Sequence, residues 1–492
     1  MITITPVRAR FAPSPTGHVH LGSARTALYD YLIAKQTGGQ FILRIEDTDR
    51  KRLVEGAEEE LINSLHWLGI DWDEGPGKDG PYGPYRQSER KEIYQKYARE
   101  LIEKDAAYYC FCTPERLSQV RQEMQKNKLP PHYDGFCRHL SKAEAEARVK
   151  AGEPHVIRFK SPKEGTTVVK DLLRGEITFE NATLDDFILV KSDGWALYHL
   201  AAIVDDHLMK ITHVIRGSEW LPTSPLHHLI WNALGWQEPE WVHLSVFLKP
   251  SGKGKMSKRE AADLSNDGYS IFIKDLEDLG YLPEAVINWV ALMGWSYDDH
   301  TEFFTLNDLV EKFSLDRLNP SPAAINFSKL DYFNKEHIKA LGDEDLARRI
   351  QPFFVKAGYQ TDMKDLVMIA PVIKERITTL DDSVEMCAFL FKDAISHDKE
   401  ALIIKDKTRE ETLRFGSDSL EILESVSVWE PAQLEAGFNA YMEAQGLTPR
   451  ELLSFLREAI SGQRVTPPLF ECMQVLGKER TIRRLKEALA LI

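Results

Sequence analysis

The chain has 492 residues, of which 43% are hydrophobic and 28% are charged. These proportions are ordinary for folded globular proteins and exclude wholesale disorder and collagen-like repeats, and the length predicts about three domains. The formal net charge of −14 argues against a phosphate-rich partner, although a local basic patch can still act because charges are screened over about 8–10 Å.

The first seventy residues alternate between strand and helix patterns. A short strand is predicted over 8–12, then a breaker cluster at 13–17, then a helix that ends at the Gly-Gly pair 38–39. A buried strand over 41–45 and a helix over 54–68 follow. This βαβα order predicts a parallel sheet, because parallel strands need a crossover between them.

The pattern changes between residues 85 and 192, where three of the five cysteines and a Pro-Pro pair occur. We predict an inserted α+β domain here, within an α/β parallel-sheet core. Strand and helix patterns resume at 196–204 and 212–215, and a Gly- and Lys-rich loop follows at 249–259. Beyond about residue 330 we predict an all-helical C-terminal region, which includes a capping box that begins at Thr448.

Two segments have residues suited to phosphate groups. The loop 13–23 opens the first predicted helix, whose N-terminus offers free N–H groups, and His20 can donate to a phosphate oxygen beside Gly22. In the Gly- and Lys-rich loop, Lys255 and Lys258 are cations that could close over a triphosphate. Taken singly, the first segment is equally consistent with a rigid proline-rich turn, and the second is more often a solvated basic loop.

Together the two segments resemble the ATP-binding signatures of the class I aminoacyl-tRNA synthetases. Further strings narrow the resemblance to the bacterial-type glutamyl-tRNA synthetases; they lie at 12–17, 44–50, 198–201, 204–207 and 214–220. The similarity extends over most of the chain and is most convincing over 8–330. Ser23 stands where many class I members have a second histidine, a departure that the glutamyl subgroup usually shares.

The resemblance implies a Rossmann-like catalytic core and ATP-dependent attachment of L-glutamate to tRNA through a glutamyl-adenylate, with ATP and Mg²⁺ as cofactors. The implied domains are the two halves of the core at 1–85 and 194–250, an acceptor-end-binding insertion at 86–193, a signature-loop and stem-contact region at 251–330, and an anticodon-binding region at 331–492. The implied ATP site is Thr16, His20, Gly22, Lys255, Ser257 and Lys258, with His20, Lys255 and Lys258 as its catalytic residues.

The implied glutamate site is Arg10, Ala12, Ser14, Glu46, Tyr198 and Arg216, and Arg376 is the implied anticodon-reading residue. The chemistry is suitable, because the planar guanidinium of arginine binds carboxylates through two hydrogen bonds. Glu46 and Ser14 are suited to the substrate ammonium, and the Tyr198 hydroxyl adds a donor. For Arg376, a surface arginine on a helix is the alternative.

Cys110-x-Cys112 and Cys137-x-His139 form a third candidate site. If each pair lies in a strand, the period of two places both members on one face, and the four side chains make a Cys₃His zinc site. Free buried cysteines and an exposed histidine are the alternative. Some bacterial glutamyl-tRNA synthetases carry zinc at matching positions, so we favour structural zinc. The small, odd number of cysteines otherwise predicts a reducing compartment without disulfides.

Other classes of protein fit less well. A small-molecule nucleotidyltransferase and a queuosine-modifying glutamyl transferase are shorter and lack the C-terminal region, and a non-catalytic RNA-binding paralogue would have lost His20 or the signature lysines. We expect L-glutamate and glutamate-accepting tRNA as partners; the sequence leaves open whether glutamine-accepting tRNA is charged as well. A cytoplasmic location without a membrane partner is expected because a secretory signal and long apolar runs are absent from the sequence. The resemblance implies a monomer, although the sequence itself leaves the oligomeric state open.

Overall fold

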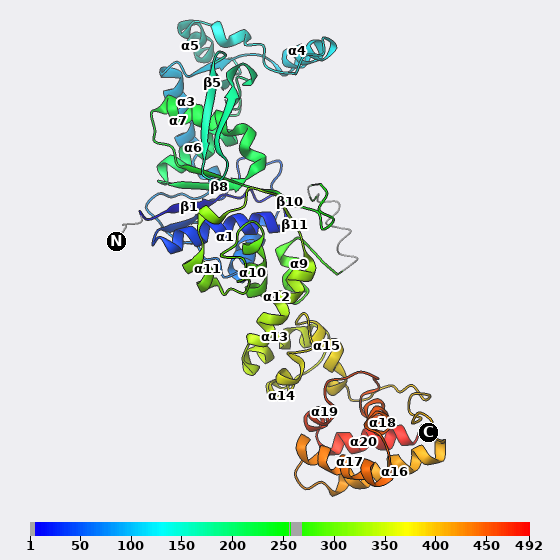
Figure 1. Ribbon diagram of the computed structural model, residues 1–492. Coiled ribbons are helices and arrows are strands. Elements are labelled where there is room, and N and C mark those ends of the chain that lie inside the picture. The colour runs from blue at the N-terminus through cyan, green and yellow to red at the C-terminus, as the bar shows by residue number, and fades with distance from the viewer. Residues whose placement is uncertain (1–4, 255, 257–267) are drawn as a thin grey trace. The chain divides into compact units, whose positions relative to one another are not determined.

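The structure, a computed structural model, describes residues 5–254, 256 and 268–492. The chain forms two compact units (Figure 1). Unit 1 comprises Met1–Leu276 and Ile287–Phe327, and unit 2 comprises Glu277–Val286 and Ser328–Ile492. No helix in the described part of the chain is long and apolar enough to cross a bilayer.

A four-stranded parallel sheet lies at the centre of unit 1. Its strands, in spatial order, are β2 (Gln40–Leu43), β1 (Arg8–Phe11), β8 (His213–Gly217) and β9 (Glu240–Leu244). From β1 the chain continues to β2 at one edge of the sheet, and from β8 it continues to β9 at the other edge. Because both crossovers are right-handed, their connecting helices lie on opposite faces of the sheet. Figure 1 shows this arrangement, with α1 (Leu21–Gln36) on one face and α6 (Tyr198–Leu208) and α7 (Ser224–Leu234) on the other. The predicted α/β parallel-sheet core is confirmed.

Local signals in the sequence set most of the early boundaries. The strand and helix expected before residue 40 are present, and α1 ends just before the Gly-Gly pair. The helix expected over 54–68 is shorter, since α2 spans Ala57–Trp67. Gly56 precedes it with a φ of 79°, a left-handed conformation that ordinary residues avoid and that prevents the helix from beginning earlier.

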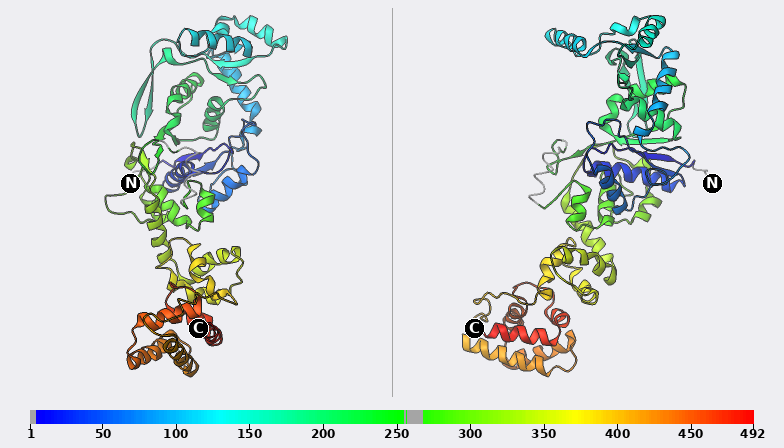
Figure 2. Two further views of the ribbon diagram at one scale, coloured as in Figure 1. Left: turned by 90° about the vertical axis from the view of Figure 1, so that its right-hand side faces the viewer. Right: turned by 180° about the vertical axis from the view of Figure 1, so that it is seen from behind.

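The segment between the two halves of the sheet has its own strands. An antiparallel sheet contains β3 (Ala107–Cys110), β4 (Val156–Phe159) and β7 (Ile188–Val190), and a separate hairpin contains β5 (Thr166–Asp171) and β6 (Gly175–Glu180). Figure 2 shows the hairpin as a long two-stranded ribbon. The helical elements are η1 (Gln87–Glu89), α3 (Lys91–Glu103), α4 (Pro114–Lys126), η2 (Phe136–His139), α5 (Lys142–Lys150) and η3 (Asn181–Thr183).

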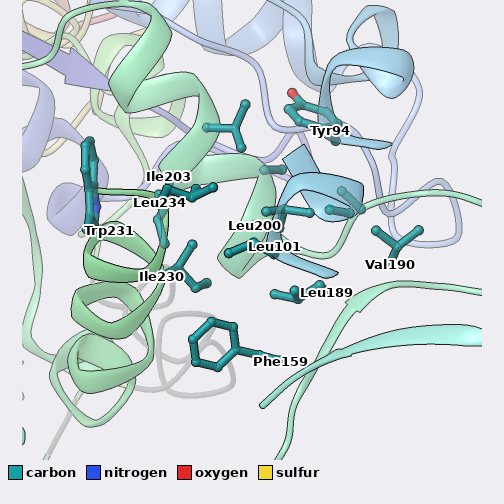
Figure 3. Packing of buried hydrophobic residues seen from close by; sticks show 14 of the residues in the cluster. Tyr94, Leu101, Phe159, Leu189, Val190, Leu200, Ile203, Ile230, Trp231 and Leu234 are labelled. Carbon is teal, nitrogen blue, oxygen red and sulfur yellow. The ribbon is translucent and has the colours of Figure 1, made fainter. Parts of the chain in front are cut away.

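A shared hydrophobic core joins this segment to the helices of the parallel sheet. Tyr94 and Leu101 of α3 and Phe159 of β4 pack with residues of α6 and α7, among them Leu200 and Trp231 (Figure 3). All five side chains are almost fully removed from solvent, so burial of apolar area stabilises the junction. The insertion is therefore held firmly against the core that carries the site.

The other elements of unit 1 that lie in the described residues follow β8. They are η4 (Ser218–Thr223), the short parallel pair β10 (Phe247–Leu248) and β11 (Ala323–Ala324), α11 (Leu306–Lys312) and η6 (Leu315–Arg317). Three helices of the described chain have residues in both units: α9 (Ile273–Asp278), α10 (Pro283–Leu292) and α12 (Phe327–Ala340).

Unit 2 is helical throughout its described residues, as predicted for the C-terminal region. Its helices are α12 (Phe327–Ala340), α13 (Asp343–Lys356), α14 (Met363–Ile373), α15 (Asp382–Cys387), η7 (Ala388–Phe391), α16 (Arg409–Ser425), α17 (Pro431–Gln445), α18 (Pro449–Ser461), α19 (Leu469–Leu476) and α20 (Lys478–Leu489). The predicted capping box is present, with Thr448 and Glu451 bonded reciprocally. Buried Arg484 donates to the carbonyl oxygens of Ile460 and Phe389 and so satisfies the ends of α18 and η7.

Candidate active site and cysteine cluster

The strand order of the parallel sheet places a switch point at the carboxyl ends of β1 and β8, which is where open α/β sheets form a ligand-binding crevice. The chain reverses its direction of travel across the sheet between these two strands, and ligands of open α/β sheets bind at such a switch point. Arg10 lies near the end of β1 and Arg216 near the end of β8. Both predicted carboxylate-binding arginines are thus brought to one edge of the sheet.

Arg10 is already paired with a carboxylate. Its Nε donates to Asp206 Oδ1 at 3.0 Å, and Arg44 Nη1 donates to the same oxygen at 2.7 Å. Arg44 Nη2 donates to Glu46 Oε1 at 3.1 Å. All four side chains are buried. Although burial opposes ionisation, Arg10 and Arg44 lower the pKa of Asp206, whereas burial raises the pKa of Glu46 despite the same two arginines.

Arg216 has a different environment, because its recorded partners in the described part of the chain are neutral groups. Nε donates to His243 Nε2 at 2.9 Å, and Nη1 lies 3.3 Å from the Tyr198 hydroxyl and 3.1 Å from His227 Nδ1. Nη2 lies 3.3 Å from Ser224 Oγ. Burial lowers the pKa of the Arg216 guanidinium. A buried cation without a carboxylate in direct contact is ready to receive an anionic ligand.

Histidines complete the surroundings of Arg216, and the guanidinium fixes their tautomers because it can only donate. His227 Nδ1 accepts from Arg216, so His227 Nε2 carries a proton that faces His199 Nδ1 at 2.9 Å. Burial and the Arg216 charge lower the pKa of His199 to about 4 and that of His227 well below its ordinary value. On the other side, His243 Nδ1 lies 2.6 Å from Asp171 Oδ2. The histidines around Arg216 are therefore neutral at physiological pH.

His20 is the N-cap of α1. Its Nδ1 accepts from the backbone N–H groups of Gly22 at 3.0 Å and Ser23 at 3.3 Å. A Cβ atom at position 22 would lie 2.9 Å from His20 Cε1, which explains why the residue two positions after the histidine is glycine. Because Nδ1 accepts, Nε2 carries the ring proton, and an N–H donor stands at the N-terminus of the helix, where phosphate binds well.

The other residues assigned to ATP and glutamate lie around the same loop or outside the described residues. Thr16 donates its backbone N–H to the Ser14 carbonyl at 2.8 Å, and Ala12 is half-buried just after β1. Lys255, Ser257 and Lys258 lie outside the described residues, so the second signature stays a prediction.

Three cysteines form a compact cluster in the insertion. The sulfur atoms of Cys110, Cys112 and Cys137 all lie within 4.8 Å of one another, and Cys112 and Cys137 are 3.6 Å apart. Sulfurs around a tetrahedral zinc ion are about 3.8 Å apart, so this geometry fits the ion. The Tyr133 hydroxyl lies 3.4 Å from Cys110 Sγ and 3.6 Å from Cys112 Sγ.

His139, the fourth predicted ligand, does not join this cluster. The prediction assumed a strand, but Cys137 and His139 lie in the 3₁₀ element η2. Successive residues of such a helix are rotated by about 120°, so side chains two positions apart point in different directions. His139 is exposed, whereas Tyr133 is buried beside the sulfurs. The hydroxyl of Tyr133, and not the imidazole of His139, therefore lies beside the three sulfur atoms.

Arg376 lies in unit 2, in the turn after α14, and is exposed. The alternative interpretation is a surface arginine on a helix, whereas Arg376 lies in a turn just after one. This position leaves the guanidinium open to solvent, and nothing in the described contacts assigns it a ligand.

Some of the site residues were not recognised from the sequence as a group. Asp171, Tyr133, His227 and His243 come from segments far apart in the chain, and no local spacing connects them. Asp206 stood in a string that carried the family resemblance, but its role as the shared partner of two arginines required the fold.

Comparisons with known proteins agree with this geometry. Residues 6–332 match the family described as tRNA synthetases class I (E and Q), catalytic domain, and residues 345–489 match an anticodon binding domain. The fold is that of a class I tRNA synthetase.

Individual relatives narrow the class. The chain is 43% identical over 489 residues to a glutamate–tRNA ligase of Dehalococcoides mccartyi and to one of Borreliella burgdorferi, with 98% of each chain covered. A crystal structure of a glutamate tRNA ligase from Elizabethkingia meningosepticum in complex with its amino acid superposes with a TM-score of 0.90 at 37% identity, covering 99% of both chains. The chain belongs to the glutamate–tRNA ligase family. The predicted family, enzyme class and attachment of glutamate to tRNA are confirmed.

Proposed function

We propose that the crevice between β1 and β8 binds glutamate with its side-chain carboxylate on Arg216. Arg216 carries a buried positive charge whose recorded partners, among the described residues, are neutral. A carboxylate can receive two parallel N–H bonds from its Nη atoms and offset the cost of that buried charge. Tyr198, at 3.3 Å from Nη1, adds a hydroxyl donor on the same side.

The β1 side of the crevice suits the other end of the amino acid. Glu46 and Ser14 are proposed to receive the ammonium group, and Arg10, beside Ala12, faces the α-carboxylate. Arg10 shares Asp206 with Arg44, so it brings little unneutralised charge. It is suited to orienting the α-carboxylate without holding it tightly, as a reacting group requires.

The reaction needs no nucleophile from the protein. An oxygen of the α-carboxylate attacks the α-phosphorus of ATP and pyrophosphate leaves, which gives glutamyl-adenylate. A hydroxyl of the terminal tRNA adenosine then attacks the carbonyl carbon, and AMP leaves with the bonding electron pair. Catalysis is therefore positioning and charge stabilisation. His20 at the N-terminus of α1, together with Thr16 and Gly22, is proposed to bind ATP, which arrives with Mg²⁺ as counter-charge.

The cysteine cluster is proposed to hold one structural zinc ion. Cys110, Cys112 and Cys137 supply three thiolate ligands, and the Tyr133 oxygen occupies the fourth side of the group. These residues form a small hydrophobic cluster of their own, apart from the core in Figure 3. When bound, the ion would stabilise this part of the insertion, because its apolar core is too small to fold firmly alone.

The remaining regions are proposed to position tRNA. The insertion at 86–193 would bind the acceptor end, 251–330 would contact the stem, and 331–492 would read the anticodon, with Arg376 as one reading residue. Bases of an RNA loop are unstacked and can be read by arginine. The match of residues 345–489 to an anticodon binding domain supports the last assignment. A monomer stays a prediction, which light scattering of the purified protein can check.

The Arg216 environment is the observation that carries the glutamate assignment, and it can be tested directly. Arg216→Ala should raise the KM for glutamate in ATP- and tRNA-dependent aminoacylation, because a substrate carboxylate left unpaired in a buried site costs about 2–5 kcal/mol. The KM for ATP should stay near the wild-type value. A variant with normal glutamate affinity would contradict the assignment. Comparing purified glutamate and glutamine tRNAs in the same assay determines the tRNA range.

A further inference from the structure

We propose that Asp171 and His243 form a positioning relay that holds Arg216 in the orientation needed for the side-chain carboxylate of the substrate. The relay would thereby set the preference for an acid over the corresponding amide. This inference rests on the proposed assignment of Arg216 to that carboxylate. It adds two residues from outside the glutamate site, one of them from the inserted segment.

Asp171 is held rigidly at the end of β5. Its Oδ1 accepts the backbone N–H groups of Leu173 at 3.0 Å and Arg174 at 2.9 Å, which form the turn of the hairpin. Its Oδ2 accepts from His243 twice, from the backbone N–H at 3.0 Å and from ring Nδ1 at 2.6 Å. Asp171 is 4% exposed and His243 is fully buried. The carboxylate therefore accepts from four donors, which fill its lone-pair positions and fix its orientation.

The carboxylate determines which ring nitrogen of His243 carries the proton. An ionised carboxylate only accepts, so Nδ1 must donate and Nε2 must present its lone pair. That lone pair faces Arg216 Nε, which donates to it at 2.9 Å. Asp171 thus acts on Arg216 through the imidazole, in the way that a buried acid orients a histidine in other enzymes.

The arrangement leaves the useful edge of Arg216 open to a ligand. His243 occupies Nε, the inner side of the guanidinium. Among the described residues, the Nη atoms contact the Tyr198 and Ser224 hydroxyls at 3.3 Å and a histidine nitrogen at 3.1 Å. A carboxylate bonded directly to Arg216 would neutralise it and compete with the substrate. With one imidazole between them, Asp171 orients the cation without occupying its Nη edge.

An acid and an amide respond differently to this orientation. A carboxylate accepts at both oxygens and pairs with both Nη groups, whereas a carboxamide offers one acceptor and places an NH₂ group against the donors of Arg216. Discrimination is strong only when the guanidinium is held in place, since a site built for one hydrogen-bonding pattern rejects an analogue that lacks it. Loss of the relay should therefore weaken glutamate more than glutamine.

A structural role is the competing explanation, because Asp171 also connects the hairpin to β9. Thr167→Val provides a matched control. Thr167 Oγ1 donates to Asn181 Oδ1 at 2.6 Å, and both residues are buried in or next to the same hairpin. The substitution removes a buried hydrogen bond without touching Arg216 or His243. It should lower the melting temperature and leave the KM for glutamate unchanged.

The test measures tRNA-dependent aminoacylation and its inhibition by glutamine. His243→Phe removes the Nε2 acceptor, and Asp171→Asn replaces an acceptor with a donor that opposes the N–H groups around it. Both should raise the KM for glutamate by about tenfold to a hundredfold, with the KM for ATP and the inhibition constant of glutamine changed by less than about twofold. His243→Gln, whose side-chain oxygen can accept from Arg216 Nε, should recover part of the loss.

A double-mutant comparison separates the relay from the site itself. If His243 acts through Arg216, then His243→Phe should leave the KM for glutamate unchanged in an Arg216→Ala background. An equal increase in both backgrounds, or equal effects on glutamate and glutamine, would overturn the relay while leaving the Arg216 assignment intact. A normal KM for glutamate in Arg216→Ala alone would instead overturn that assignment, and the relay with it.

Discussion

Asp206 and Asp30 are two buried carboxyl groups beside Arg10. Replacing each with asparagine is expected to change the free energy of unfolding in opposite directions. Asp206 Oδ1 accepts from Arg10 at 3.0 Å and from Arg44 at 2.7 Å. Asp30 of α1 is fully buried, and neither of its oxygens has a hydrogen-bond partner among the described residues. Burial raises the pKa of Asp30 well above its ordinary value, with Arg10 offsetting this only in part. The ionised form is therefore favoured for Asp206, whereas burial favours the protonated form of Asp30.

The contacts give the expected magnitudes. Asp206→Asn removes the counter-charge that two buried guanidinium groups share, and breaking such a buried pair lowers the free energy of unfolding by about 3–5 kcal/mol. Asp30→Asn replaces the buried carboxyl with an uncharged amide of the same shape. At neutral pH it should raise the free energy of unfolding, because the amide avoids the cost of burying a group that is ionised in the unfolded chain.

The pH dependence of the two variants follows from the directions of the pKa shifts. The pKa of Asp206 is lowered on folding, so its stabilisation is complete above the unfolded value of about 3.9 and is lost as pH falls through the folded value. The pKa of Asp30 is raised, so its cost to stability appears as pH rises from about 3.9 to the folded value. The deficit of Asp206→Asn should shrink in acid, and the gain of Asp30→Asn should vanish there.

Urea unfolding followed by tryptophan fluorescence can measure both variants. Every tryptophan except Trp429 lies in unit 1, so the signal reports mainly the unit that contains Asp30 and Asp206. If Asp206→Asn were as stable as wild type, or if Asp30→Asn cost as much as Asp206→Asn, the charge assignment around Arg10 would be refuted.

Three further predictions concern metal, ATP and tRNA. Metal analysis should find about one zinc ion per chain in the wild type and in His139→Ala but none in Cys137→Ser; loss of zinc from His139→Ala would return the histidine to the ligand set. Lys258→Ala should lower the rate of aminoacylation without lowering the melting temperature, because a cation at a transferring phosphate acts mainly in the transition state. Unchanged turnover would remove it from the mechanism. Arg376→Ala should shift the preference between glutamate and glutamine tRNAs and leave ATP binding unchanged; identical preferences would show that the residue does not read the anticodon.

Local sequence signals predicted the elements well because breakers and periodicity act over a few residues. The first strand, the end of α1 and the capping box at Thr448 all follow from such signals. The cysteine site was only partly predictable, since the alternation expected for 137–139 applies to strands and the chain adopts a 3₁₀ turn there. Tyr133 precedes Cys137 by four residues, and no spacing rule for metal sites singled it out.

The proposed relay could not be predicted from the sequence, for a different reason. Asp171 and His243 are 72 residues apart and meet only because the β5–β6 hairpin is bonded to β9. Neither residue lies in a signature string, and each alone is consistent with an ordinary buried polar group. Their connection to Arg216 depends on the register that pairs Arg216 with His243 across neighbouring strands. Long-range register of this kind is a property of the fold rather than of any local segment.

We propose that the unequal charge environments of Arg10 and Arg216 produce a preference for a dicarboxylic amino acid. Arg10 and Arg44 share Asp206, and Arg44 also contacts Glu46, so positive and negative groups on the β1 side are closely matched. Arg216 is surrounded in the described contacts by neutral acceptors, and the imidazole of His243 separates it from Asp171. A buried cation without a contacting anion costs several kcal/mol. A substrate with a second carboxylate relieves that cost when it binds, because its negative charge pairs with Arg216. An amide is neutral and does not relieve the cost, so a site of this kind favours the acid.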